Sequence, residues 1–186
     1  MTRIMTPNQA LAHADLIVDR AALQQAITAM ARVIAEDYRD QRPVYLTIMH
    51  GALPFAGHLS IELGTFGQEL NFDYLHATRY GGRSVGGGLK WRHYPQTPLS
   101  GRRVLLVDDI LDEGHTLCQV RNWCLAQHAS DVRIAVLAVK RHDRCVEGLS
   151  ADYVGVEVPD RYVFGFGMDF EEHLRTLPAI YALRDS

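Results

Sequence analysis

The sequence predicts an α/β domain built on a mainly parallel sheet with helices on its faces. Val104–Val107 is an unbroken apolar run, β-branched at both ends and too short for a helix, which is typical of a strand buried on both faces. A short polar loop follows it, and an amphipathic segment begins at Thr116, so the order is strand, loop, helix. Ligands of such sheets bind at the carboxyl ends of the strands, which is where this loop lies.

The rest of the chain supplies further elements of the same kind. Short apolar or β-branched runs predict strands, at Val44–Met49, Leu70–Ala77, Val132–Val139 and Tyr153–Val156. Apolar residues at three- and four-residue steps behind a capping residue predict helices, from Pro7 to about Ala14, from Asp19 to about Tyr38, and from about Pro54 to Leu63, where Gly64 would end the helix. We expect the first two helices to cover the sheet or an oligomer interface.

The totals describe a single domain of ordinary size. The chain has 186 residues, of which 47% are apolar and 22% are charged, as is typical of a soluble globular protein. The net charge of −3 gives no electrostatic case for binding nucleic acid. No apolar stretch approaches the roughly 18 residues that span a bilayer. No signal peptide opens the chain, and the three cysteines lack zinc or disulfide spacing. We therefore expect a cytoplasmic protein that binds neither nucleic acid nor membrane.

The loop after Val107 combines acids with an anion-binding sequence. Asp108 and Asp109 are adjacent, Asp112 follows, and Glu113-Gly114-His115-Thr116 leads into the predicted helix. A carboxylate accepts several hydrogen bonds and therefore suits the vicinal hydroxyls of a sugar. Backbone N–H groups at a helix N-terminus, beside a glycine that permits close approach, suit a phosphate. A sugar phosphate would satisfy both halves of the loop.

The run from Arg103 to Leu117 resembles the phosphoribosyl-diphosphate (PRPP) signature of the type I phosphoribosyltransferases. That signature is an apolar strand, an acidic pair, two apolar residues and a loop closed by Gly-x-Thr. The resemblance implies the fold of that family, with a small C-terminal hood. It also implies a site for the ribose and phosphate of PRPP, formed by Asp108, Asp109, Ile110, Leu111, Glu113, Gly114, His115 and Thr116. Glu113 and His115 depart from the family pattern, which usually has a small residue and often a lysine there.

Two more segments resemble the hypoxanthine–guanine members of this family, in the family's order. His50-Gly51 follows a predicted strand, and the resemblance implies that this loop binds pyrophosphate. His50 stands where lysine is common, so the backbone of the loop is the expected contact. Arg175 matches an arginine that binds pyrophosphate.

The segment of about residues 159–175 resembles the hood that covers the base in 6-oxopurine phosphoribosyltransferases. The resemblance implies that Tyr162 stacks on the purine and that the backbone of Val163 reads its edge. Lys140 ends a predicted strand and would donate to the 6-oxo group of the base. Asp112 would take or share the proton on purine N7.

The resemblance also implies Mg²⁺ as the cofactor, because Mg²⁺ bridges pyrophosphate and ribose oxygens in this family. Asp169 matches the family's metal-binding acid, and we include Asp108 and Asp109 in the expected metal site. The metal would act together with PRPP to neutralise the departing pyrophosphate.

A glycine-rich segment separates the third strand from the PRPP signature. Five of the ten residues from Arg79 to Gly88 are glycine, so this stretch cannot pack on itself and loses much entropy on ordering. It is either a loose surface loop or a lid, over about residues 79–97, that closes on an anionic substrate. The lid would carry Arg79 and Tyr80, with Arg83 and Lys90 as further cations.

These resemblances imply a purine-salvage enzyme that converts hypoxanthine or guanine and PRPP to IMP or GMP and pyrophosphate, as a homodimer or homotetramer. A xanthine-preferring relative is the main alternative. A regulator on the same fold that controls RNA would want a basic face, which the acidic balance does not supply. A two-component receiver domain also opens with Val-Leu-Leu-Val-Asp-Asp, but here that motif lies past the middle of the chain.

Overall fold

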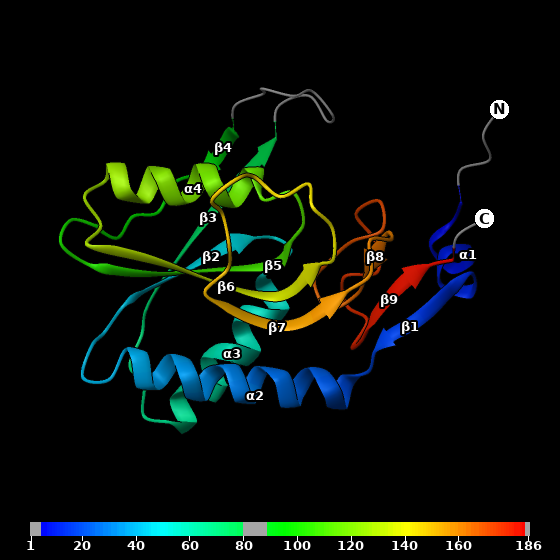
Figure 1. Ribbon diagram of the computed structural model, residues 1–186, viewed down its shortest axis with the longest axis horizontal. Coiled ribbons are helices and arrows are strands. Elements are labelled where there is room, and N and C mark those ends of the chain that lie inside the picture. Colours follow the sequence, from blue (N-terminus) through cyan, green and yellow to red (C-terminus); the bar gives the residue numbers. More distant parts are fainter. Residues whose placement is uncertain (1–4, 80–88, 185–186) are drawn as a thin grey trace.

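The structure, a computed structural model, describes residues 5–79 and 89–184 and contains a central mainly parallel sheet (Figure 1). Within these ranges the sheet has six strands in the order β4-β3-β2-β5-β6-β7, with antiparallel pairing between β3 and β4 alone. The strands are β2 (Val44–Met49), β3 (Asn71–Arg79), β4 (Leu89–His93), β5 (Arg103–Leu111), β6 (Asp131–Lys140) and β7 (Tyr153–Val158). The predicted α/β class and mainly parallel sheet are confirmed.

Helices cover both faces of the sheet (Figure 1). Helices α2 (Arg20–Asp37) and α3 (Leu53–Thr65) lie on one face, and α4 (His115–Ala126) lies on the other. The strand residues alternate accordingly, because successive side chains of a strand point to opposite faces. Leu105 packs in the cluster that contains α2 and α3, whereas Leu106 packs in the cluster that contains α4.

The connections place a crevice between β2 and β5. Strand β2 continues through α3 to β3 on one side, whereas β5 continues through α4 to β6 on the other. The two strands pair only as far as Thr47 with Val107, after which β5 remains paired with β6 alone. This is the topological switch point of an open α/β sheet, and ligands bind outside the carboxyl ends of the strands there.

A second, smaller sheet lies at one end of the molecule (Figure 1). It is antiparallel, with the order β1-β9-β8, and α1 packs beside it. Its elements are α1 (Pro7–Ala12), β1 (Ala14–Val18), β8 (Val163–Phe164) and β9 (Ile180–Leu183). Phe164 and Phe170 form its own small core, and Val163 and Phe166 join the core of the main sheet. This sheet forms the hood, so residues near both ends of the chain build it.

The structure corrects several predicted boundaries. Strand β5 does not end at Val107, because its pairing with β6 continues through Leu111 opposite Val139. The acidic pair therefore lies on the strand and not in a loop after it. Helix α1 ends at Ala12, since the chain turns there into β1, which was not predicted. Gly64 lies inside α3, and the chain leaves the helix at Gly67, which has a φ of +76°.

The predicted lid is partly strand in the structure. Arg79 is the last residue of β3, and Leu89–His93 forms β4, which pairs antiparallel with β3. Within the predicted lid of about residues 79–97, Arg79 and Leu89–His93 are therefore strand, whereas residues 94–97 are not. The residues between the two strands, including Tyr80 and Arg83, lie outside the described ranges.

In the parts of the chain that the structure describes, none of the helices has the length and apolar character needed to cross a membrane.

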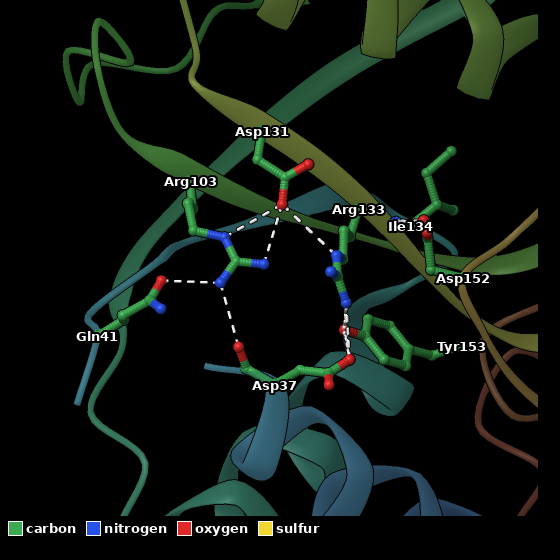
Figure 2. A network of polar contacts seen from close by, with 8 residues as sticks. All are labelled: Asp37, Gln41, Arg103, Asp131, Arg133, Ile134, Asp152 and Tyr153. Carbon is green, nitrogen blue, oxygen red and sulfur yellow. Dashed lines mark hydrogen bonds and ion pairs between the residues drawn. The ribbon is translucent and has the colours of Figure 1, made fainter. Parts of the chain in front are cut away.

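A polar network at the amino ends of β5, β6 and β7 joins the sheet to the end of α2 (Figure 2). Arg103 donates to Asp131 Oδ2 from Nε at 3.1 Å and from Nη2 at 2.9 Å. Asp37 Oδ2 accepts from Arg133 Nη1 and from the hydroxyl of Tyr153, each at 2.7 Å. The network lies at the opposite end of the sheet from the hood, so it supports the fold and lies apart from the crevice.

We predict that Asp37→Asn lowers the free energy of unfolding by about 1 kcal/mol, because the amide keeps one acceptor oxygen but loses the ion pair with Arg133. The ion pair is partly exposed, at 35% for Arg133 and 39% for Asp37, which limits the effect. Urea unfolding at neutral pH measures it. Glu36→Gln, an exposed change on the same helix, is the control and should alter the value by less than about 0.5 kcal/mol. Equal effects of the two changes would contradict the role of the network.

Candidate active site

Asp108 and Asp109 lie at the carboxyl end of β5, where the strand has lost β2 as a neighbour. Asp108 is 9% exposed and its Oδ1 accepts from the backbone N–H of Asp109 at 3.0 Å. Asp109 Oδ1 accepts from the N–H of Ile110 at 2.8 Å. Burial and the negative charge of Asp109 raise the pKa of Asp108 well above its usual range, and burial also raises the pKa of Asp109. The pair is therefore costly to ionise without a partner.

Glycine backbones from two other segments reach this pair. A Cβ added to Gly51 would overlap the carboxylate of Asp109, and a Cβ added to Gly167 would overlap the carbonyl oxygen of Gly51. Gly167 also has a φ of +106°, which a larger side chain rarely adopts. The β2 loop, the end of β5 and the hood thus meet around Asp109.

Asp112 lies on the loop after β5 and is bound by two side chains from the end of β6. Its Oδ2 accepts from Lys140 Nζ at 2.7 Å, and its Oδ1 lies 2.6 Å from His142 Nε2. Burial would raise the pKa of Asp112, but the hydrogen bonds from Lys140 and His142 outweigh it and lower the pKa. Asp112 is therefore an ionised acceptor at neutral pH, whereas the pKa values of Asp108 and Asp109 are shifted in the opposite direction.

All of the residues predicted to contact a base line one pocket of about 330 Å³ between the end of the sheet and the hood. The lining residues are Asp109, Ile110, Asp112, Lys140, Tyr162, Val163, Met168 and Asp169. Tyr162 is 48% exposed, and its ring meets Phe170 edge to face at 5.6 Å between centroids. The pocket thus offers a cation, an anion and an exposed aromatic ring.

Arg175 stays within the hood in this structure. Its Nη1 donates to the carbonyl oxygen of Gly167 at 2.8 Å, and its Nη2 lies 2.8 Å from Asp169 Oδ1. Its charge also lowers the pKa of Asp109, against the larger effect of burial. Arg175 therefore orders the hood segment that contacts Gly51 and adds positive charge beside the acidic pair.

The first turn of α4 follows the predicted phosphate loop. Gly114 is the N-cap residue in a left-handed conformation with a φ of +79°, and within the described chain no side chain caps this helix. A Cβ at Gly114 would overlap the end of the Leu149 side chain, so a larger residue here would need Leu149 to shift as well as an unfavourable φ. Glu113 and His115 lie 3.7 Å apart, between Oε2 and Nε2, and both side chains are exposed. The N-terminal N–H groups of such a helix favour an anion.

His50 lies beyond β2 at the crevice, and its ring packs against that of His76 from β3, with centroids 4.4 Å apart. The pKa of His76 is lowered by burial and by the neighbouring His50 and Arg92. His50 and Gly51 therefore lie at the ligand edge of the sheet, as the sequence predicts. Contact of His50 with pyrophosphate stays a prediction.

Sequence reasoning missed two residues of this site. His142 was missed because it lies beyond the end of β6, and nothing in the sequence there indicates its contact with Asp112. Met168 resembled an ordinary core residue. Of the predicted lid, the side chain of Arg79 and all of Tyr80 lie outside what the structure describes.

In the described ranges no group of three or more histidine, cysteine, aspartate or glutamate side chains is arranged to hold a metal ion. Asp169 Oδ1 is paired with Arg175, while Asp108 and Asp109 are buried together. Mg²⁺ is usually bound by one or two carboxylates together with substrate phosphates and water. These carboxylates therefore fit a Mg²⁺ ion for which a phosphorylated ligand supplies most of the other oxygen ligands.

Comparisons with known proteins find similarity to phosphoribosyltransferases. A family model described as "Phosphoribosyl transferase domain" matches residues 13–172. A hypoxanthine-guanine phosphoribosyltransferase of Streptococcus thermophilus is 32% identical over 172 residues, which cover 92% of this chain and 89% of that protein. The Bacillus subtilis protein of the same name is 30% identical, with 91% and 92% covered. A solved Trypanosoma cruzi hypoxanthine phosphoribosyl transferase superposes with a TM-score of 0.85 at 26% identity, with 91% of each chain covered.

We predict that Asp108→Asn stabilises the ligand-free protein at pH 8, by about 0.5–2 kcal/mol. The native Asp108 keeps its proton to higher pH than the unfolded residue, whose pKa is near 3.8. Native Asp108 therefore binds more protons above pH 3.8, and the free energy of unfolding falls as pH rises toward the native pKa. Asparagine keeps the acceptor oxygen but does not ionise, so the variant lacks this pH-dependent fall in the free energy of unfolding.

Urea unfolding in a chelator at about pH 8 and pH 4 tests this, and the difference from wild type should shrink at the lower pH. Asp40→Asn, a change at an exposed acid, is the control and should show no such pH dependence. If Asp108→Asn is less stable than wild type at pH 8, the negative charge of Asp108 is already compensated in the folded wild-type protein.

Proposed function

The chain belongs to the phosphoribosyltransferase family, and we propose that it is the purine-salvage enzyme that joins hypoxanthine or guanine to the ribose 5-phosphate of PRPP. The products are IMP or GMP and pyrophosphate. The observation that carries the proposal is the pocket in which the donor Lys140 and the acceptor Asp112 lie side by side, 2.7 Å apart. A 6-oxopurine presents the matching acceptor and donor on one edge, at O6 and N7–H.

The ribose phosphate is held at the end of β5 and the start of α4. The N–H groups at residues 113–116 receive the 5′-phosphate, supported by the uncapped helix terminus. Asp108 and Asp109 accept hydrogen bonds from the ribose hydroxyls. These hydroxyls would add to the single backbone hydrogen bond that each carboxylate accepts, and so help to stabilise two acids whose pKa values burial raises.

The reaction needs a proton acceptor beside the base. The C1′–O bond to pyrophosphate breaks with its electron pair staying on the pyrophosphate oxygen, and a bond forms between C1′ and N9 of the purine. The proton on N7 passes to Asp112. The lowered pKa of Asp112 keeps it ionised and ready for this step. Holding both reactants at one site lowers the entropy loss of bringing them together.

Pyrophosphate leaves toward the β2 loop. The backbone of His50 and Gly51 lies beside Asp109, and Arg175 is anchored on Gly167 nearby. A guanidinium and backbone N–H groups suit a departing polyphosphate.

We propose Mg²⁺ as the metal. The family is consistent with a divalent metal in general, and carboxylate oxygens suit Mg²⁺ that is bound together with PRPP. Asp109 and Asp169 would hold it, with Asp108 close by, and when bound it would neutralise pyrophosphate charge.

We also propose a cytoplasmic homodimer or homotetramer. Leu53, Ile61 and Phe72 on α3 and β3 are 55%, 71% and 63% exposed, and a second copy could cover this apolar surface. Cys118, Cys124 and Cys145 are free thiols, which supports a reducing compartment. Static light scattering of the purified protein tests the oligomeric state.

We predict that Asp112→Asn lowers kcat by about 10²–10⁴-fold, because the amide keeps the shape of the side chain but cannot take the proton. The KM for PRPP should change little. Asp143→Asn, an exposed change in the loop after β6, is the matched control and should keep wild-type kinetics. Near-normal turnover of Asp112→Asn would remove this residue from the mechanism.

The choice of base tests Lys140. An ammonium has donors and no acceptor, so adenine would place its amino donor against it, and such a mismatch can cost roughly 10⁴–10⁵-fold in kcat/KM. We predict hypoxanthine and guanine first, xanthine weaker and adenine last. Comparing kcat/KM for the four bases decides the order. Efficient use of adenine would overturn the role of Lys140, whereas a preference for xanthine would leave that role intact and overturn only the rank given to xanthine.

A further inference from the structure

Asp112 is held at both carboxylate oxygens by side chains from one short segment. Lys140, the last residue of β6, donates to Oδ2 at 2.7 Å. His142 lies two residues further, with Nε2 2.6 Å from Oδ1. The side chain of His142 is 3% exposed and that of Lys140 is 15% exposed, whereas Asp112 is 39% exposed. A nearly buried histidine therefore holds a more open carboxylate.

The hydrogen bonds of His142 fix its tautomer. Its Nδ1 accepts from the backbone N–H of Arg144 at 3.1 Å, so this nitrogen carries no proton. A neutral imidazole has one donor and one acceptor nitrogen. The proton is therefore on Nε2, which donates to Asp112 Oδ1.

We infer that His142 is a positioning residue for Asp112, which pins Oδ1 of the carboxylate and directs Oδ2 toward the N7–H of the purine. This inference rests on the proposed function, in which Asp112 accepts that proton. It adds a second residue to the base-binding segment, and that residue touches the acceptor side chain and not the substrate.

The need for such a residue follows from the two tasks of Lys140. Without a base, Lys140 donates to Asp112 Oδ2. With a base, it must also donate to O6, and Oδ2 must accept from N7–H. A carboxylate held by Lys140 alone could rotate as the ammonium shifts. With Oδ1 pinned by His142, the other oxygen keeps its place, and misplacement of a reacting group by about 1 Å can cost roughly 10²-fold in rate.

The charges around Asp112 define how its pKa should respond. Lys140 and His142 bind it, and the charge of Asp112 helps to raise the pKa of Arg144, which pairs mainly with Asp160 at 2.7 Å. The thiol of Cys145 also lies near, and its pKa is raised by burial and, to a smaller extent, by the charge of Asp112. Asp109, Tyr162 and Asp169 line the same pocket as Asp112. Loss of the donor at His142 removes one of the two hydrogen bonds that lower the pKa of Asp112. The acid limb of activity should then move to higher pH.

The test compares His142→Phe, which keeps a ring without a donor, with His142→Gln, whose amide can donate from a similar position. We expect His142→Phe to lower kcat by roughly 10-fold to 10²-fold, to shift the acid limb of kcat/KM for hypoxanthine to higher pH, and to leave the KM for PRPP within about twofold. His142→Gln should recover most of the rate and the pH profile. Arg141→Gln, at an exposed side chain bonded to Glu157, is the control and should match wild type.

If the wild-type enzyme is active and His142→Phe has the same rate and pH profile, the positioning role is overturned. A wild-type protein that transfers ribose phosphate to neither hypoxanthine nor guanine would instead overturn the proposed function. Nitrogen-15 NMR of the wild-type histidine side chains gives a test that needs no variant to fold. We expect the ring proton of His142 on Nε2, and a ring that carries its proton on Nδ1 instead would contradict the inference.

Discussion

The close approach of Gly51 to Asp109 is the contact on which the rest of the site depends. The carboxylate occupies the space that a side chain at position 51 would need, and Gly167 approaches the carbonyl of Gly51 from the other side in the same way. Three distant segments therefore meet at the switch point of the sheet, where β2 and β5 separate after Thr47 and Val107. Interiors are packed closely enough that one added carbon would move all three segments.

The acids at the end of β5 have opposite electrostatic characters, and this difference divides their tasks. Asp108 and Asp109 are buried together, and burial raises the pKa of each. Asp112 is held by Lys140 and His142, and its pKa is lowered. Environments that separate the pKa values of neighbouring acids are a recurrent way of assigning roles in active sites. The pairing of a ready acceptor with a donor supports chemistry on a 6-oxopurine.

The sequence predicted the parts of the fold that depend on local pattern. The apolar run at Val104–Val107 is a strand with each residue fully buried, and Lys140 ends its strand as expected. Strand β1 was missed because its five residues gain their structure by pairing with β9, far along the chain, and short segments carry little local signal. His142 was missed for a similar reason, since its role depends on a contact with Asp112 that spacing does not reveal. Tertiary contacts decided both.

A crystal structure of the protein with IMP would test whether β2, β5, α4 and the hood form one nucleotide site. We expect the 5′-phosphate on the backbone N–H groups of residues 113–116 and the ribose hydroxyls on Asp108 and Asp109. We also expect N7 within hydrogen-bonding distance of Asp112 and O6 within reach of Lys140. A nucleotide bound away from the β2–β5 crevice, or with its 6-oxo edge turned from Lys140, would contradict it.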